Sequence, residues 1–270
     1  MRQVVIGKKT IQIPSDWTEF TTPQLELIAR ISQHAMPVET AKLYVVLNLL
    51  GMRITYKAGE DVYRFVWRHR RGIITTDEMA RLTSVYDFLY AEVKEKPGTC
   101  VVLPSFTADP YPRLTDGLYA WHGPGDLFER VTYDQFVYAN TYVSQVADDK
   151  QAMPKLLACL WHRRKQFDPD RIERDALLLS RLPKHRQMVM FWYWCGSMAA
   201  LRRLFPRVFS GSGNSDGNVF QEQQRIIDAL AEGDMTRKQA VREGLLLDAM
   251  FSMDESVRKT EEMKKAINKK

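Results

Sequence analysis

The chain has 270 residues, with 39 Lys plus Arg against 33 Asp plus Glu and a formal net charge of +6. Hydrophobic residues make up 45% and charged residues 27% of the sequence. These proportions are typical of globular proteins and exclude a disordered chain and a fibrous or collagen-like repeat. The length is enough for one large or two modest domains.

The apolar and cysteine patterns bear on where the protein resides. Three widely separated cysteines without a C-x-x-C spacing indicate neither a disulfide framework nor a zinc site, so we expect a reducing compartment. Lys8 and Lys9 interrupt the first apolar run, which is therefore unlike a signal peptide. The longest uncharged apolar window, residues 188–201, is shorter than the roughly 20 residues that cross a bilayer, and it predicts a buried helix.

The N-terminal part shows short-period and helical patterns in turn. Alternating apolar residues predict a β-hairpin over residues 4–13. Thr22-Pro23 predicts the start of a helix that runs to about Gln33, and a second helix follows from Pro37 to Gly51. Alternation between residues 53 and 74 predicts an additional strand pair with a turn at 70–72, and residues 75–93 predict a helix.

The remaining chain reads as helical after a segment rich in breakers. Five of the twelve prolines lie between residues 96 and 125, which is typical of a connector. Four helices are predicted: residues 132–146, residues 153–164, a helix that begins at residue 168, and residues 183–205. Further helices are predicted at the C-terminus, with breaks near Gly233 and Ser252. The predicted fold is mainly α with minor β, divided into 1–95 (hairpin plus helices), 96–125 (connector), 126–209 (helical core), 210–218 (flexible linker) and 219–270 (C-terminal helices).

No residue constellation predicts a reaction. The histidines never pair at i,i+4, the Gly7–Thr10 fragment lacks the frame of a phosphate-binding loop, and no G-x-S-x-G motif occurs. The acidic residues of 168–175 suit the first turn of a helix, where they stabilise exposed N–H groups. We therefore predict no catalytic residue, no cofactor and no metal. An enzyme centred on His122, beside Trp121 and a turn, is kept as a remote alternative.

The basic surplus is local. Residues 161–208 hold 11 Lys or Arg and 4 acidic residues, so this segment carries the whole excess of positive charge. Its aromatic residues favour a buried helix, whereas its cations suit phosphate or an acidic partner. The candidate nucleic-acid or partner patch consists of Arg163, Arg164, Lys165, Lys184, Arg186, Arg202 and Arg203.

The C-terminal region carries a methionine-rich apolar stripe. Such a stripe packs on the body of the protein or on a partner helix, and the sequence leaves both readings open. The candidate partner-binding helix contains Leu245, Leu246, Met250 and Phe251.

The run IQIPSDWTEFTTPQL at residues 11–25 resembles the opening of uncharacterised, mainly helical proteins encoded in structural (tail-module) gene clusters of phages and prophages of gut bacteria. Residues 123–127, 132–136, 156–161 and 205–209 are similar to the second half of such proteins. The resemblance implies a non-enzymatic structural or chaperone-like tail-assembly protein, in the bacterial cytoplasm or the virion. It implies other virion or assembly proteins, or further copies of the chain, as partners. A nucleic-acid-binding protein that uses residues 161–208 is the alternative.

Overall fold

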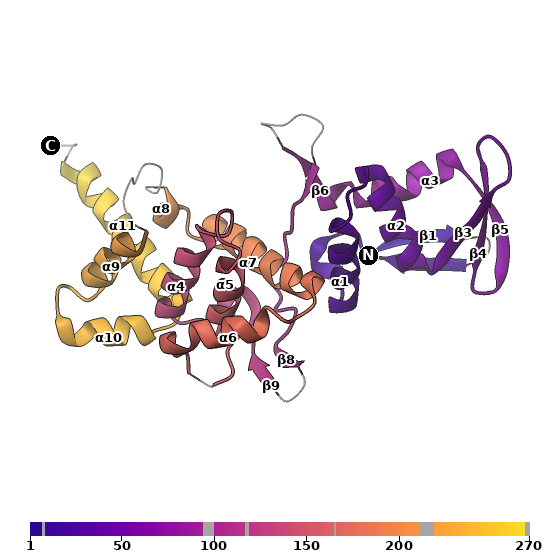
Figure 1. The fold of residues 1–270 in the computed structure, drawn as a ribbon. Helices are drawn as coiled ribbons and strands as arrows, with labels where there is room; N and C mark the ends of the chain where they lie inside the picture. The colour runs from indigo at the N-terminus through magenta and orange to yellow at the C-terminus, as the bar shows by residue number, and fades with distance from the viewer. Residues whose placement is uncertain (7–8, 94–99, 117–118, 165, 211–218, 268–270) are drawn as a thin grey trace. The chain divides into compact units, whose positions relative to one another are not determined.

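The computed structural model describes residues 1–6, 9–93, 100–116, 119–164, 166–210 and 219–267 (Figure 1). As predicted, the fold is mainly α with minor β, at 57% helix and 18% strand. The chain divides into two compact units. Unit 1 comprises Met1–Phe106 and Lys184–Val189, and unit 2 comprises Thr107–Pro183 and Met190–Lys270.

Unit 1 begins with the predicted hairpin and two predicted helices, all of which are confirmed. The N-cap of the first helix is Thr21, one residue before the Thr22 that the sequence predicts, because Thr21 forms a reciprocal capping box with Gln24. Gly51 ends the second with a left-handed φ of 66°, which glycine adopts without a side-chain clash. The elements are β1 (Arg2–Ile6), β2 (Lys9–Ile13), α1 (Thr22–Ser32) and α2 (Val38–Leu50).

The predicted strand pair over residues 53–74 is part of a larger sheet. Three antiparallel strands occur in the order β3 (Met52–Lys57), β4 (Val62–Trp67) and β5 (Arg70–Thr75). The second turn lies at Arg68 and His69, whose φ angles are 46° and 67°, and not at residues 70–72. Sequence reasoning missed this turn because two-residue hairpin turns with positive φ usually carry Asn-Gly.

The predicted helix over residues 75–93 is shorter than expected. Its start is confirmed, because Thr75 and Glu78 form a capping box, but α3 spans only Thr76–Thr83 and a 3-10 helix follows over Ser84–Leu89. The early end places Tyr86 in an aromatic core with Phe20, at a ring separation of 6.1 Å. Unit 1 also contains β6 (Tyr90–Glu92) and β7 (Cys100–Val102), so part of the predicted connector is paired strand.

Unit 2 packs helices around buried aromatic side chains. Trp161 and Tyr193 are fully buried with ring centroids 5.7 Å apart. With Trp192 and Trp194 also buried, the core prediction is confirmed for these four aromatic residues of the basic segment, whereas Phe167 and Phe191 are half-buried. Helix α7 gives its residues 184–189 to unit 1 and the remainder to unit 2. The elements are β8 (Arg113–Asp116), β9 (Tyr119–His122), α4 (Tyr133–Val143), α5 (Ala152–Leu160), α6 (Ile172–Leu179), α7 (Lys184–Leu204), α8 (Pro206–Phe209), α9 (Val219–Leu230), α10 (Met235–Glu243) and α11 (Leu246–Ile267).

The C-terminal predictions have mixed outcomes. A break at Gly233 is confirmed, with a φ of 76°. The predicted break near Ser252 is wrong, because α11 runs through that residue. Most of the predicted linker, residues 211–218, lies outside the described residues.

Candidate functional site

Arg163, the first residue of the predicted basic patch, is held inside unit 2. Its guanidinium forms an ion pair with the buried Asp175 carboxylate at 2.7 Å. The same group lies 5.0 Å from the Tyr119 ring centroid and 5.6 Å from that of Trp121. Arg163 is only partly exposed, and its charge is paired and stacked within the unit, where it stabilises the fold.

The other members of the patch are distributed over both units. In unit 1, Arg186 pairs with Glu26 at 3.1 Å, and Lys184 donates to Gln187 at 3.4 Å. In unit 2, Arg164 is exposed and lies 3.7 Å from Asp168.

Lys165 lies outside the described residues. Arg202 and Arg203 are exposed in the last turn of α7, where cations offset the negative end of the helix dipole. The exposed cations of the patch that belong to unit 2 are therefore Arg164, Arg202 and Arg203. Nucleic-acid binding by residues 161–208 stays a prediction.

The predicted partner-binding residues separate into two pairs. Leu246 and Met250 are buried in unit 2, and the Leu246 N–H donates to the Val131 carbonyl at 2.9 Å. Leu245 and Phe251 are 43% and 62% exposed. Packing within unit 2 therefore accounts for two of these four residues, and the other two face solvent in the described structure.

Beyond this docked part, helix α11 continues into residues 259–267, here called the α11 end (Figure 1). Every residue of the α11 end is exposed. Met263 and Ile267, one helical turn apart, are 66% and 71% exposed. Glu261 lies 3.6 Å from Arg207 of α8, and Glu262 lies 2.7 Å from Arg258. The α11 end is thus a helix with an uncovered apolar pair and charged flanks.

The loop around His122 is built around a buried carboxylate. Asp109 accepts hydrogen bonds from the N–H groups of Tyr111 at 2.9 Å and Gly125 at 3.0 Å. Burial raises the pKa of the Asp109 carboxyl to about 6. Tyr193 donates from its hydroxyl to the Gly125 carbonyl and accepts from the Phe128 N–H at 2.9 Å. The bonds from Tyr111 and Gly125 engage both carboxylate oxygens of Asp109, so this carboxylate holds the loop in its conformation.

His122 itself is exposed, and its backbone pairs with that of His162 through bonds of 2.9 and 3.2 Å. Burial lowers the pKa of the His162 imidazole. Among the described residues, no three His, Cys, Asp or Glu side chains form a group able to hold a metal ion. The arrangement offers neither a nucleophile–base pair nor a metal centre within that part of the chain.

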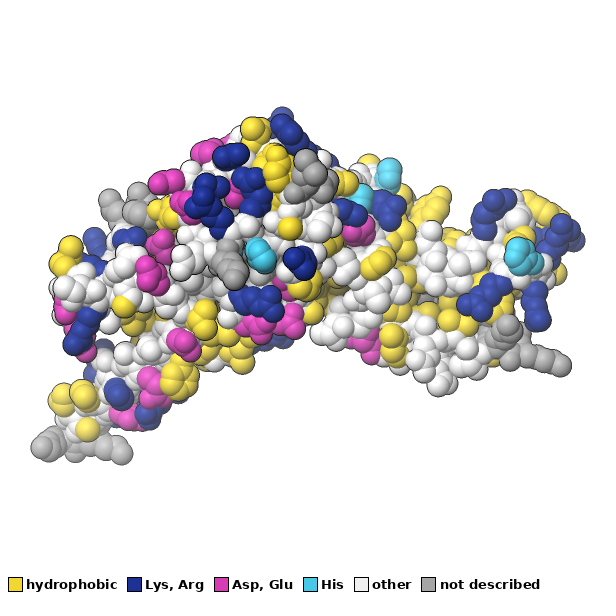
Figure 2. Space-filling model, turned by 90° about the horizontal axis from the view of Figure 1, so that it is seen from below, with side chains coloured by type: hydrophobic (Ala, Val, Ile, Leu, Met, Phe, Trp, Pro, Cys, Tyr) yellow, Lys and Arg dark blue, Asp and Glu magenta, His cyan; other side chains and the backbone are white. Residues whose placement is uncertain are grey.

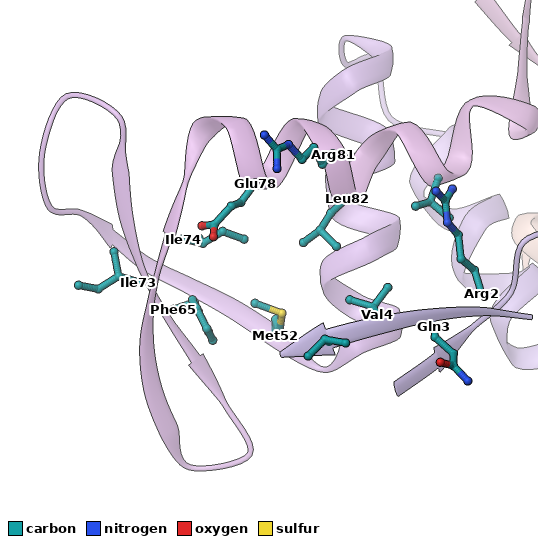
Figure 3. A pocket seen from close by; sticks show the side chains of 12 residues that line it. Arg2, Gln3, Val4, Met52, Phe65, Ile73, Ile74, Glu78, Arg81 and Leu82 are labelled. Carbon is teal, nitrogen blue, oxygen red and sulfur yellow. The ribbon is translucent and has the colours of Figure 1, made fainter. Parts of the chain in front are cut away.

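A groove of about 390 Å³ opens in unit 1 between β1, the β3–β5 sheet and α3 (Figure 3). Val4, Met52, Phe65 and Leu82 line it with apolar surface, and Arg2 and Arg81 contribute charge to the lining. Glu78, which also lines the groove, is engaged in capping α3. Such a groove has the chemistry to accept an apolar segment.

Sequence reasoning missed a second basic surface, on strands β3–β5. Residues 52–75 contain six Lys or Arg and two acidic residues, but residues 1–160 as a whole hold 18 of each sign. Counting over the longer segment therefore hid this local excess. The alternation of Arg64, Val66 and Arg68 was the available signal, because alternate residues of a strand share a face.

No family model, no curated protein and no solved structure matches the chain. None of the described helices combines the length and apolar character needed to span a membrane.

Proposed function

We propose that the chain is a non-enzymatic structural or tail-assembly protein of a phage or prophage that acts through protein–protein contacts. The proposal rests on the α11 end, where Met263 and Ile267 are exposed. The first turns of the same helix are packed within unit 2 through Leu246 and Met250. The resemblance of residues 11–25 to proteins of phage structural gene clusters supplies the biological setting.

The exposed end of a helix is stabilised when a partner covers its apolar side chains. Isolated helices shorter than roughly 12–15 residues are marginal in water, and most helices in proteins gain stability by packing an apolar face. The α11 end has an apolar pair but no packed face in the described structure. Burying a Met or Ile side chain contributes about 1.5–3 kcal/mol. A partner groove that covers this pair therefore gains affinity and stabilises the last turns of α11 at the same time.

The charged flanks suit the same role. Glu261 and Glu262 precede Met263 along the α11 end, and Lys264 and Lys265 follow it. Charged residues that border an apolar pair are typical of helices that lie in a partner's groove, where the charges form the polar rim. We infer that the partner is another virion or assembly protein that presents an apolar groove of helical dimensions.

Light scattering after size-exclusion chromatography tests the proposal, with the protein alone and with each product of the neighbouring genes. We expect a complex with at least one of these products. The double variant Met263→Gln/Ile267→Gln should weaken it about tenfold or more, since 1.4 kcal/mol is tenfold in Kd. The matched control is Met235→Gln, a 74% exposed methionine of α10, which should leave the affinity unchanged. A strict monomer that binds none of the products contradicts the proposal.

A further inference from the structure

The outward face of the β3–β5 sheet carries arginines in register. Arg53, Val66 and Arg71 oppose one another across the three strands. Directly opposed residues of antiparallel strands share a face, and so do alternate residues along one strand. The next row on this face is Tyr56, Arg64 and Ile73, of which Tyr56 is 51% and Ile73 63% exposed. All three arginines are exposed.

The opposite face of the same sheet is the packed one. Met52, Trp67 and Ile74 are buried there, and the Trp67 indole N–H donates to the Leu50 carbonyl at 2.9 Å. The core thus fixes the register of the strands, because a slip by one residue would expose this apolar set. The outward arginines are therefore held in place by the packing beneath them.

The turn at the tip of the β4–β5 hairpin adds further cations at a conformational cost. Trp67 and Arg70 pair across it, and Arg68 and His69 occupy the two turn positions with positive φ. Non-glycine residues in this conformation cost on the order of 1 kcal/mol each, and they are often found where function requires the side chain. The Arg68 guanidinium lies 5.5 Å from the Trp67 ring centroid, so it is oriented as well as exposed.

The acidic residues of this region lie at the end of β4 that is far from the turn arginines. Glu60 and Asp61 precede β4, whereas Arg68 follows it, and a strand of this length separates its two ends by roughly 20 Å. Within the part of the chain that the structure describes, Arg53, Arg64, Arg68, Arg70 and Arg71 form no ion pair with a carboxylate. Figure 2 shows Lys and Arg side chains gathered over β3–β5, around a histidine.

We propose that the outward face and tip of the β3–β5 sheet bind the phosphate backbone of a nucleic acid. Arginine presents planar donors that match phosphate oxygens in pairs. Arg53 and Arg71 lie two strand spacings apart, roughly 10 Å, so one backbone can contact both. Tyr56, with the Arg64 guanidinium 5.3 Å from its ring centroid, offers an exposed aromatic ring on which a base can stack. This aromatic ring favours a nucleic acid over an acidic protein.

The test is fluorescence anisotropy with a labelled DNA duplex and a labelled single strand over a salt series. Each neutralised phosphate contributes about −0.9 to the slope of log K against log salt on a duplex and about −0.7 on a single strand. Arg70 opposes Trp67 and so belongs to the packed side of the sheet, which leaves Arg53, Arg64, Arg68 and Arg71 for phosphate. Four arginine contacts predict a duplex slope near −3.6, so the affinity falls roughly 150-fold between about 50 and 200 mM salt. A duplex preference points to groove binding, and a single-strand preference points to stacking on Tyr56; both support the proposal.

The variants locate the surface. Arg53→Gln/Arg64→Gln/Arg71→Gln should reduce the slope by roughly 2–3 and weaken binding for all sequences alike, because phosphate contacts carry no base information. The matched control Arg164→Gln/Arg202→Gln/Arg203→Gln removes the same charge from unit 2 and should change the affinity less than about threefold. Circular dichroism confirms the folding of both variants.

Three results would overturn the proposal. The first is absence of binding at about 50 mM salt, where phosphate contacts are strongest. The second is an equal loss in the control variant, which would place the contact in residues 161–208. The third is equally tight binding of polyglutamate of the same total charge, which would show attraction to any polyanion. If the arginines of β3–β5 serve only to prevent strands of two molecules from pairing, no nucleic-acid binding is expected even at low salt.

Discussion

Replacing Gly123 with alanine should destabilise unit 2 by several kcal/mol, because the added methyl group has no space. An ideal Cβ at this position lies 2.1 Å from the Asp109 Oδ2 atom and 2.6 Å from the Tyr111 carbonyl oxygen. The second neighbour is backbone, and both residues are buried. The carboxylate and the loop that it organises must therefore move apart to admit the side chain.

The magnitude follows from what that movement breaks. Overpacking a buried site costs about 1–3 kcal/mol. Shifting the Asp109 carboxylate also breaks its bonds to the N–H groups of Tyr111 and Gly125, and each buried donor left unpaired costs about 1–3 kcal/mol. The lower backbone entropy of unfolded alanine returns about 0.4–1 kcal/mol. We expect a net loss of roughly 2–8 kcal/mol, a large part of the 5–15 kcal/mol that typical domains possess.

Urea unfolding followed by amide hydrogen exchange measures this loss, because exchange separates the amides of unit 2 from those of unit 1. The control is Gly59→Ala, whose Cβ would meet Val62 at 3.7 Å, an ordinary contact distance. It should raise the free energy of unfolding by about 0.4–1 kcal/mol, because only the lower entropy of the unfolded chain changes there. A Gly123→Ala protein within about 1 kcal/mol of wild type would refute the role assigned to the Asp109 loop.

Two further outcomes concern buried charges in unit 2. The folded-state pKa of Asp109, about 6 against an ordinary 3.8, means that the folded protein holds this proton more tightly than the unfolded chain. The contribution of Asp109 to stability should therefore rise on the order of 2 kcal/mol as the pH falls from about 6 to about 4. Asp109→Asn should lack this rise in stability. If the urea midpoints of the wild type and the variant change with pH in the same way, Asp109 is not the group responsible. Arg163→Met should lower the free energy of unfolding by about 3–5 kcal/mol, because it leaves the Asp175 carboxylate buried without its partner. The control Arg164→Met removes an exposed arginine and should lower it by less than about 0.5 kcal/mol. Equal melting temperatures for the two variants would contradict a stabilising role of the Arg163–Asp175 pair.

Local signals in the sequence predicted the helix starts and stops correctly where the partners are close in sequence. The capping boxes of Thr75 with Glu78 and of Thr132 with Gln135 are examples, as is the stop at Gly51. The end of α3 was predicted too late, because the aromatic core that selects the 3-10 segment is assembled from distant parts of unit 1. No periodicity within residues 75–93 contains that information.

The candidate surfaces were harder to predict for the same reason. Arg163 was assigned to a solvent-exposed patch, but its ring partners Tyr119 and Trp121 precede it by some forty residues. Leu245 and Leu246 are neighbours in one apolar stripe, yet only the packing of α11 on Val131 decides which of the two is buried. The register of β3–β5, which gathers the outward arginines, depends on a turn that the sequence does not signal.

The α11 end is the proposed contact with the assembly partner, and the mass of the complexes, measured by light scattering, reports whether that contact forms. Wild-type protein mixed with the correct assembly partner should elute as a complex with the summed mass. Met263→Gln/Ile267→Gln should elute as separate components under the same conditions, while Met235→Gln behaves as wild type. A complex that survives the double variant with unchanged affinity, or no complex with any neighbouring gene product, would contradict the claim.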